Sequence, residues 1–494
     1  MQLCSKPKHC SSDSTINTWY CGNRRYKRHK RSYTAGREVP AMVAYSLPRL
    51  GRRELLRQAT TSGALVVLAS ACRPGQPSSP APGPVGRPVK IIYWSHHSAT
   101  GPRAKLEEEL LARFMRENPL ITIEYQQPPT QGTTYEDKLL STLVAGAGPE
   151  LFNLFDGRAP AFIDKGYCAE IDYNATGFGS PRQLQDLYLV PTALDGHKWK
   201  GKYYGIPSEL SNYCLHINPT MFRNAGLDVE RDWPKTWESM LDVARILTKR
   251  EGEEYVQRAF DFDYAAGGGR FWIYFGGMAY QLGGPIMSED GKRPMVNHPG
   301  AVQALAYWQD WVLRYRYGSP KAENISPAFQ NERASMIILG SWYAPGWRNQ
   351  YPDLFERYIV KPFPRFRDAR YDHGSHNYSY CWMVNSAAPA DAQRAAWKVA
   401  VFLSNFPAEY LETTGLLQPK KGLEQSAAFK NTKFLDVFLD DMRKSTVEPR
   451  AISYAEITAS LKRGLERAYV AGEPPKQALD ATQQEIEQII AREG

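Results

Sequence analysis

The strongest constraint on the fold is an alternation of short apolar segments with amphipathic segments between residues 89 and 155. Residues 89–94 (VKIIYW), 121–125 (ITIEY) and 151–155 (LFNLF) are rich in apolar, β-branched or aromatic side chains, which is typical of buried strands. Between them, residues 103–116 and 135–144 carry apolar side chains three and four positions apart, which predicts helices. Because strands that alternate with helices form parallel βαβ units, we predict a layered α/β fold.

Beyond residue 200 the same patterns continue with longer connections. Residues 202–218 form an extended stretch that Pro207 interrupts. Residues 335–339, 358–363 and 382–385 are short apolar segments that predict strands. Apolar side chains at helical spacing predict further helices at residues 221–227, 237–247, 301–313, 391–406, 408–416 and 475–492. The mixed α/β pattern therefore extends over the whole body of the chain.

The net charge lies at the N-terminus. The formal charge of +9 comes from 61 Lys and Arg against 52 Asp and Glu. Residues 1–71 hold 13 of the basic and 3 of the acidic residues, so the rest holds 48 basic and 49 acidic residues. A basic surface would indicate a nucleic-acid or membrane-surface partner. Because the body is neutral, we expect no nucleic-acid partner.

Residues 42–71 have the layout of a secretory signal. Arg52 and Arg53 precede an uncharged run at residues 59–71, and Cys72 follows. This run is too short to span a bilayer of about 30 Å. The order of signal, Cys72 and a Pro/Gly/Ser-rich tether at residues 72–88 resembles a bacterial lipoprotein precursor in which Cys72 is lipidated. The two arginines resemble a twin-arginine export motif, and ordinary signal peptidase cleavage after residue 71 stays an alternative.

Residues 1–41 do not fit this layout, because signal segments normally begin close to the start of a precursor. Met42 would give a leader of ordinary length. We expect residues 1–41 to be an upstream extension outside the functional protein. The alternative is a disordered basic tail.

The remaining motifs give no support for a metal, a cofactor or a nucleophile. The body contains Cys168, Cys214 and Cys381 without a CxxC pair, and the histidines form no HExxH motif. The glycine clusters lack the context of a phosphate-binding loop, and no GxSxG motif occurs. We therefore predict no metal site, no cofactor and no catalytic residue.

Ten short segments, in order along residues 88–494, resemble the extracellular solute-binding proteins of carbohydrate ABC importers, the group related to the maltose-binding protein. Each segment is weak alone, and their common order makes the resemblance specific. The longest matches are residues 114–119 (FMRENP), 135–149 (YEDKLLSTLVAGAGP), 201–207 (GKYYGIP), 234–238 (PKTWE), 340–342 (GSW) and 475–479 (PKQAL).

The resemblance implies an α/β, two-lobed periplasmic-binding-protein-like fold with hinge strands between the lobes. Lobe 1 would comprise residues 89–207 and about 385–442, and lobe 2 residues 213–381 and about 448–494. The crossings would lie near residues 207–213, 382–385 and 442–448. Cys214 and Cys381 would lie on two of these crossings, so a disulfide between them stays open.

The resemblance also implies a sugar or oligosaccharide ligand in the cleft between the lobes. A sugar presents a hydroxyl rim and apolar C–H faces, so its site needs aromatic rings together with carboxylates or amides. Trp272, Trp308, Trp311 and Trp397 fit core positions better than the site. The candidate ligand-binding residues lie at strand ends, on the crossings or in matching cleft segments, and they are Trp94, His96, Asp156, Glu209, Tyr213, Trp342, Tyr378, Tyr380 and Tyr454.

By resemblance, the chain would be a monomeric receptor outside the cytoplasm, anchored by a lipid at Cys72, that delivers its ligand to an ABC permease. It would not be an enzyme. One alternative is an exported carbohydrate-active enzyme that uses Asp156 and Glu209 as paired carboxylates. Another is a binder of a polyol phosphate, which would need an arginine such as Arg158, Arg270 or Arg450.

Overall fold

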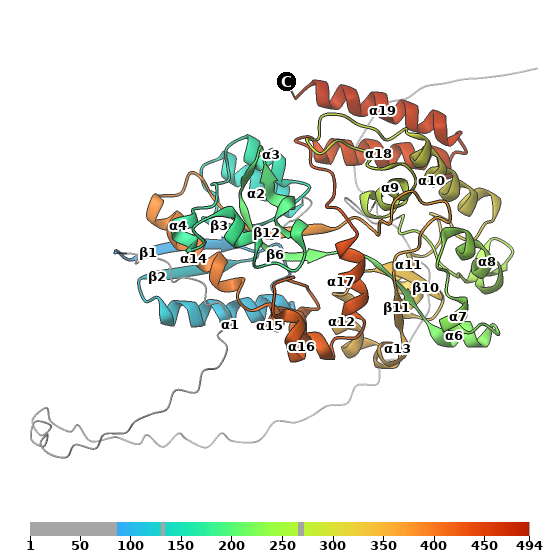
Figure 1. Cartoon of the computed structure of the whole chain (residues 1–494), viewed down its shortest axis with the longest axis horizontal. Helices are drawn as coiled ribbons and strands as arrows, with labels where there is room; N and C mark the ends of the chain where they lie inside the picture. Colours follow the sequence, from blue (N-terminus) through green and yellow to red (C-terminus); the bar gives the residue numbers. More distant parts are fainter. Residues whose placement is uncertain (1–85, 130–133, 265–270, 494) are drawn as a thin grey trace, which may run out of the picture. The chain divides into compact units, whose positions relative to one another are not determined.

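The computed structural model describes residues 86–129, 134–264 and 271–493 (Figure 1). These residues belong to one compact unit. The predictions for residues 1–41, for the signal at residues 42–71, for Cys72 and for most of the tether fall outside the described residues. Within the described ranges, no helix has both the length and the apolar character needed to cross a membrane.

The first sheet contains the strands that the alternating pattern predicts. Its order is β2-β1-β3-β12-β6. Strand β1 pairs in parallel with β2 and β3, whereas β12 is antiparallel to both β3 and β6. Its strands are β1 (Val89–Trp94), β2 (Ile121–Gln126), β3 (Leu151–Phe155), β6 (Gly205–Ser211) and β12 (Tyr378–Val384). The predicted parallel βαβ units are confirmed.

Helices cover both faces of this sheet (Figure 1). On one face, α1 (Pro102–Glu117) and α14 (Ala390–Leu403) bury their apolar stripes in one core cluster, with Phe114 and Trp397 inside it. On the other face, α2 (Tyr135–Val144) and α3 (Ala159–Asp164) pack in a separate cluster around Leu139 and Phe162. The side chain of Thr134 accepts a hydrogen bond from the Asp137 amide and so caps the start of α2.

The second sheet has three strands in the order β10-β7-β11, all antiparallel to their neighbours. They are β7 (Cys214–Ile217), β10 (Met336–Leu339) and β11 (Ile359–Lys361). Only Asn212 and Tyr213 separate the end of β6 from the start of β7. The chain therefore passes directly from the first sheet to the second at these two residues.

The second passage between the sheets lies earlier than the sequence predicts. The whole of β12 belongs to the first sheet, because Tyr378 already pairs with Ser211 of β6. Asn377, just before this strand, donates to the Met442 carbonyl over 2.9 Å and accepts from the Glu448 amide over 2.9 Å. The start of β12 is thus tied to residues 442–448, where the sequence places the third crossing. The predicted lobe boundaries otherwise stay predictions.

The largest core cluster surrounds the second sheet and contains tryptophans from helices. Trp272, Trp308 and Trp311 are at most 1% exposed, as is Trp397 in the first cluster, which confirms their predicted core positions. Trp308 stacks on Phe262 with 4.0 Å between ring centroids. Near the C-terminus, α18 (Tyr454–Tyr469) and α19 (Pro475–Ala491) pack against each other within this cluster (Figure 1).

The three cysteines of the described part, Cys168, Cys214 and Cys381, are buried and carry free thiols. The Cys214–Cys381 disulfide that the sequence left open is therefore absent. The Cys381 thiol instead contacts the Nδ1 atom of His197 over 2.7 Å.

The remaining elements connect the two sheets or cover them, and they include two small hairpins that the sequence did not predict. The hairpins are β4 (Lys198–Trp199) with β5 (Lys202–Tyr203) and β8 (Lys249–Glu251) with β9 (Glu254–Gln257). The helices are α4 (Tyr173–Thr176), α5 (Pro181–Gln185), η1 (Pro191–His197), α6 (Pro219–Asn224), α7 (Val229–Asp232), α8 (Trp237–Leu247), η2 (Trp272–Gly276), α9 (Gly277–Gly283), α10 (Pro299–Gln309), η3 (Asp310–Arg314), α11 (Ile325–Gln330), α12 (Tyr343–Gln350), α13 (Pro352–Arg357), α15 (Pro407–Thr414), η4 (Leu423–Gln425), α16 (Ala427–Asn431) and α17 (Leu435–Arg443).

Candidate ligand-binding site

A cavity of about 860 Å³ is lined by residues from the first sheet, from the β6–β7 passage and from segments near the second sheet. It brings together seven of the nine candidate residues, although they are spread over more than 350 positions of sequence. These seven are His96, Glu209, Tyr213, Trp342, Tyr378, Tyr380 and Tyr454.

Trp94 and Asp156 do not line this cavity. The Trp94 indole packs in the core beside α2 and donates to Gln126 Oε1 over 2.7 Å. The Asp156 carboxylate accepts from the Ser379 amide over 2.8 Å, from the Ser379 hydroxyl over 3.1 Å and from the Gly157 amide over 2.8 Å. Both residues lie at strand ends as expected, but their polar groups form hydrogen bonds within the protein.

Aromatic rings form much of the cavity wall, and some are stacked whereas others meet at steep angles. The His96 and Tyr380 rings stack with 3.8 Å between centroids and 8° between planes. The Trp342 indole meets the Tyr213 ring at 86° and the Tyr378 ring at 87°. Rings that face in different directions can cover the C–H faces of more than one sugar unit.

Trp342 depends on a close approach to Gly340. Trp342 immediately precedes α12, and its indole covers the Gly340 backbone. A Cβ atom at residue 340 would lie 1.6 Å from the indole ring. The glycine of the GSW segment, which is part of the family resemblance, is needed for a physical reason, because only glycine admits the ring in this orientation.

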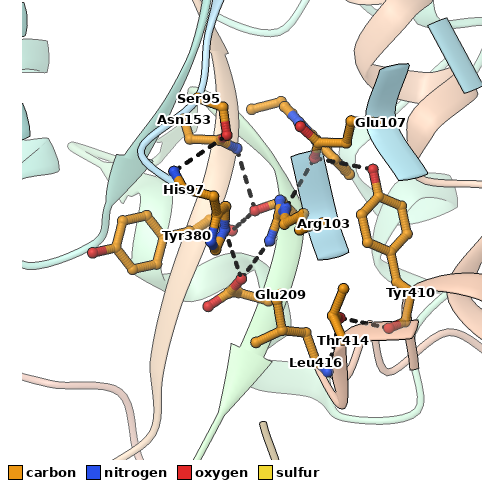
Figure 2. A network of polar contacts seen from close by, with 12 residues as sticks. Ser95, His97, Arg103, Glu107, Asn153, Glu209, Tyr380, Tyr410, Thr414 and Leu416 are labelled. Carbon is orange, nitrogen blue, oxygen red and sulfur yellow. Dashed lines mark hydrogen bonds and ion pairs between the residues drawn. The ribbon is translucent and has the colours of Figure 1, made fainter. Parts of the chain in front are cut away.

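Behind the aromatic wall lies a buried polar network centred on Arg103 (Figure 2). Arg103 Nη1 donates to Glu209 Oε2 over 2.6 Å, and its Nε donates to Glu107 Oε1 over 2.9 Å. The side chains of Arg103 and Glu209 are 3% and 4% exposed. Glu107 also accepts hydroxyl hydrogen bonds from Tyr93, Tyr125 and Tyr410. The network holds Glu209 in one orientation at the cavity.

Burial and charge set the ionisation of these groups. Burial lowers the pKa of Arg103, but the carboxylates of Glu107 and Glu209 outweigh it, so its pKa is raised and the guanidinium stays charged. Burial raises the pKa of Glu209, and the Arg103 charge opposes that rise. Burial, reinforced by Arg103, lowers the pKa of both His96 and His97 well below the usual range. Both imidazoles are therefore neutral at neutral pH.

Several polar atoms in this region have no hydrogen-bond partner within the described part of the chain. They are buried nitrogen atoms, namely His96 Nδ1, His97 Nε2 and Arg103 Nη2. His97 Nε2 lies 3.8 Å from Glu209 Oε2, beyond hydrogen-bond distance. Because a buried polar atom without a partner is costly, these atoms are candidates to bind hydroxyl groups of a ligand.

A second polar group lines the cavity next to Tyr454. The Tyr454 hydroxyl donates to Glu448 Oε2 over 2.5 Å, whereas Glu448 Oε1 has no partner among the described residues. Burial, together with the charge of Asp156, raises the pKa of Glu448 well above its usual range. Burial also raises the pKa of Asp156, to about 7.

The cations that line the cavity all have partners. Arg103 binds two carboxylates, Arg158 pairs with Asp137 over 2.6 Å, and Lys462 lies 3.8 Å from Glu466. Arg450, an earlier candidate for phosphate binding, does not line the cavity and donates to the backbone carbonyl of Lys198 over 2.9 Å. Arg270, the other candidate, falls outside the described residues. Over the described ranges, no group of three or more His, Cys, Asp or Glu side chains could hold a metal ion.

Sequence reasoning missed several residues that line the cavity, namely His97, Arg103, Glu136, Phe155, Phe271 and Glu448. Arg103 and Glu107 are four residues apart on α1, a spacing that is equally common on exposed helix surfaces. Phe155 directly precedes Asp156 at the end of β3, so the strand-end argument pointed to the neighbouring residue. Glu448 lies on the third predicted crossing, which was a usable signal.

Residues 109–435 match the family described as bacterial extracellular solute-binding protein. This match extends over well more than half of the chain, and the chain therefore belongs to that family. The description of the family places its members outside the cytoplasm.

Two curated relatives show where the sequence similarity lies. An arabinooligosaccharide-binding protein of Halalkalibacterium halodurans is 20% identical over 295 residues, which cover 57% of this chain and 60% of the relative. A multiple sugar-binding protein of Streptococcus mutans is 24% identical over 268 residues, which cover 50% of this chain and 56% of the relative. The match thus spans little more than half the length of these relatives.

Similarity to solved structures extends further than similarity in sequence. An ABC substrate-binding protein from Listeria monocytogenes, solved in complex with cycloalternan, has a TM-score of 0.66 and 20% identity. The alignment covers 81% of this chain and 99% of that chain. This similarity confirms the predicted two-lobed α/β binding-protein fold.

Proposed function

We propose that the protein is the substrate-binding component of an ABC importer and that it binds an uncharged sugar or oligosaccharide in the 860 Å³ cavity. Closure of the lobes on the ligand would give a shape that the permease can recognise. The observation that carries this proposal is the combination of crossed aromatic walls with buried, unpartnered polar atoms at one cavity.

The energetics favour a ligand that contacts more than one aromatic ring. Covering roughly 40 Å² of a sugar face at about 25 cal/mol per Å² gives about 1 kcal/mol, whereas micromolar affinity needs about −8 kcal/mol. Several rings and several hydrogen bonds must therefore act together. The volume of about 860 Å³ lies in the upper part of the usual range for ligand pockets, which supports an oligosaccharide.

The partners of the charged groups support an uncharged ligand over a polyol phosphate. A phosphate is best bound by an arginine fork that is free to donate two hydrogen bonds. The guanidinium of Arg103 is held between Glu107 and Glu209, which within the described ranges leaves only its Nη2 atom free to donate, and Arg158 is paired with Asp137.

Binding without chemistry also fits the carboxylates better than glycoside cleavage does. The enzyme alternative needs Asp156 and Glu209 to flank one glycosidic bond. Asp156 accepts hydrogen bonds from Ser379 and Gly157 and does not line the cavity. Glu209 is paired with Arg103.

We further propose that the protein is an exported, monomeric lipoprotein that is anchored through a lipid on Cys72. The support is the order of the basic segment, the uncharged run, Cys72 and the tether. Intact mass of the membrane-extracted protein tests this anchor. A diacylglyceryl adduct on a chain that begins at Cys72 is expected, and an unmodified chain that begins at Arg73 or earlier would contradict it.

A thermal-shift screen of the purified exported protein tests the proposed function. Maltotriose, an arabinotriose, cycloalternan and tagatose form the sugar panel, and sorbitol 6-phosphate represents polyol phosphates. We expect a sugar to raise the melting temperature and to be recovered unchanged by chromatography. A shift with sorbitol 6-phosphate alone, or a cleaved sugar, would instead support one of the alternatives.

Variants at two tryptophans show whether the shift arises at the cavity. Trp342→Ala should abolish the shift. Trp233→Ala is the control, because Trp233 lies near Lys235 and Lys361 and does not line the cavity. Equal shifts in both variants would remove Trp342 from the site.

A further inference from the structure

Glu448 lies on the segment between α17 and α18, where the chain passes the start of β12. Its amide donates to the Asn377 carbonyl over 2.9 Å, which fixes the backbone of this segment. The residue is 1% exposed, yet it lines the cavity. The segment between α17 and α18 therefore holds a titratable side chain at the ligand cavity.

Tyr454 orients the Glu448 carboxyl, but only one of the two carboxyl oxygens has a hydrogen-bond partner in the described part of the chain. Oε2 accepts the Tyr454 hydroxyl over 2.5 Å, and Oε1 has no partner within the described ranges. The Tyr454 ring is itself held in place, because it packs edge-on against Phe155 at 5.8 Å and covers Gly157. A Cβ atom on Gly157 would lie 2.6 Å from that ring. Packing therefore fixes the Tyr454 ring, and its hydroxyl in turn orients the Glu448 carboxyl.

No cation neutralises this carboxyl in the described structure. The titratable groups that act on Glu448 are Asp156 from the end of β3 and Tyr454 from α18. Arg450 acts on Asp156, but it donates to the carbonyls of Asp195 and Lys198. Two buried carboxyls without a cation between them resist ionising together, which raises the pKa of both and favours the state in which the pair retains one proton.

A protonated carboxyl offers an O–H donor and a carbonyl acceptor, and both suit a sugar hydroxyl. We propose that Glu448 is a ligand-contacting residue that binds a hydroxyl group of the ligand as an uncharged carboxyl, so that ligand affinity depends on the proton of the Glu448–Asp156 pair. This inference rests on the proposed function. It assigns the ligand a hydroxyl, not an ammonium or a phosphate, at this end of the cavity.

The sign of the pH effect follows from the protonated form. Binding requires the proton, so affinity is constant at acidic pH and falls once the pair ionises. With one proton linked to binding, the limiting loss is about tenfold per pH unit. A ligand ammonium would reverse this sign, because it would need the ionised carboxylate.

Glutamine reproduces the shape and hydrogen bonding of a protonated carboxyl and cannot ionise. The affinity of the panel sugar that gives the largest thermal shift would be measured by calorimetry from about pH 5 to pH 9. We expect Glu448→Gln to keep the affinity within about threefold and to lose the pH dependence, and Glu448→Ala to lose at least about tenfold. Glu456→Gln, an exposed position on α18 that pairs with Arg492, is the control and should behave as the wild type.

Equal losses in Glu448→Gln and Glu448→Ala would overturn the uncharged carboxyl, and unchanged affinity in Glu448→Ala would overturn the contact. Circular dichroism verifies the fold of each variant, and the near-isosteric Gln variant keeps the test valid if the Ala variant does not fold.

A sugar-free measurement separates this inference from the proposed function. The pKa of Glu448 is higher in the folded protein than in the unfolded chain. The group therefore stabilises the folded state fully at pH values below the unfolded pKa, and this stabilisation is lost as the pH rises through the folded pKa. The melting temperature of ligand-free Glu448→Gln should therefore rise relative to wild type between about pH 5 and pH 8. If no panel sugar binds, the proposed function fails while this difference persists. A difference that does not change with pH would overturn the proton claim.

Discussion

At the scale of single residues, the site depends on how closely side chains approach the backbone. Trp342 needs the bare Gly340 backbone, and Tyr454 needs Gly157. The sequence predicted both aromatic residues, because the family resemblance covers their segments. It could not predict that Asp156 does not line the cavity, since the Ser379 groups that donate to it lie 223 positions further along the chain.

A methyl group at residue 340 should displace the Trp342 indole, because the new Cβ atom would lie 1.6 Å from the ring. We expect Gly340→Ala to cost about 1–3 kcal/mol of unfolding free energy and at least about tenfold in sugar affinity. Urea unfolding and calorimetry measure the two effects. Gly346→Ala in α12 is the matched control, because no atom lies within 4 Å of its added Cβ. Equal effects of the two substitutions would contradict this account.

At the scale of elements, α1 carries two ion pairs with the same spacing and the same 2.9 Å distance. Arg103–Glu107 is at most 3% exposed at each side chain, whereas Arg113–Glu117 is 53% and 50% exposed. Sequence cannot tell these pairs apart, because only tertiary packing buries the first. Local alternation did predict the βαβ strands. The predicted start of β12 was too late in the sequence, because the first residues of this strand are tyrosine and serine instead of aliphatic residues.

Arg103→Met should remove about 3–5 kcal/mol of unfolding free energy, because it leaves the carboxylates of Glu107 and Glu209 buried without a cation. Arg113→Met should cost less than about 1 kcal/mol, since exposed pairs and ring contacts contribute little. Chemical denaturation of both variants at pH 7 measures the difference. Similar losses in the two variants would mean that the Arg103 network does not hold the site together.

At the scale of the whole molecule, the chain passes from the first sheet to the second between β6 and β7 and returns to the first sheet before β12. The order of ten short motifs predicted this arrangement, although composition and periodicity alone would have given only an α/β class. The second passage lies a few residues earlier than predicted, because strand pairing with β6 and β3 decides where β12 begins.

The described cysteines give a prediction for the folded chain under oxidising conditions. Residues 73–494 contain Cys168, Cys214 and Cys381, which are buried and unpaired. A thiol reagent should label three thiols after denaturation without a reductant and almost none in the native protein. A count of one thiol after denaturation would indicate the Cys214–Cys381 bridge after all.

The central claim is that this cavity binds an uncharged oligosaccharide. Calorimetric titration of the exported protein with the panel sugar and with sorbitol 6-phosphate tests it most directly. We predict one sugar per chain, an affinity that is unchanged between about 0.05 and 0.5 M salt, and a loss of at least about tenfold in Trp342→Ala. Binding of the phosphate alone, with affinity that falls as salt rises, would contradict the claim, as would undiminished sugar binding by Trp342→Ala.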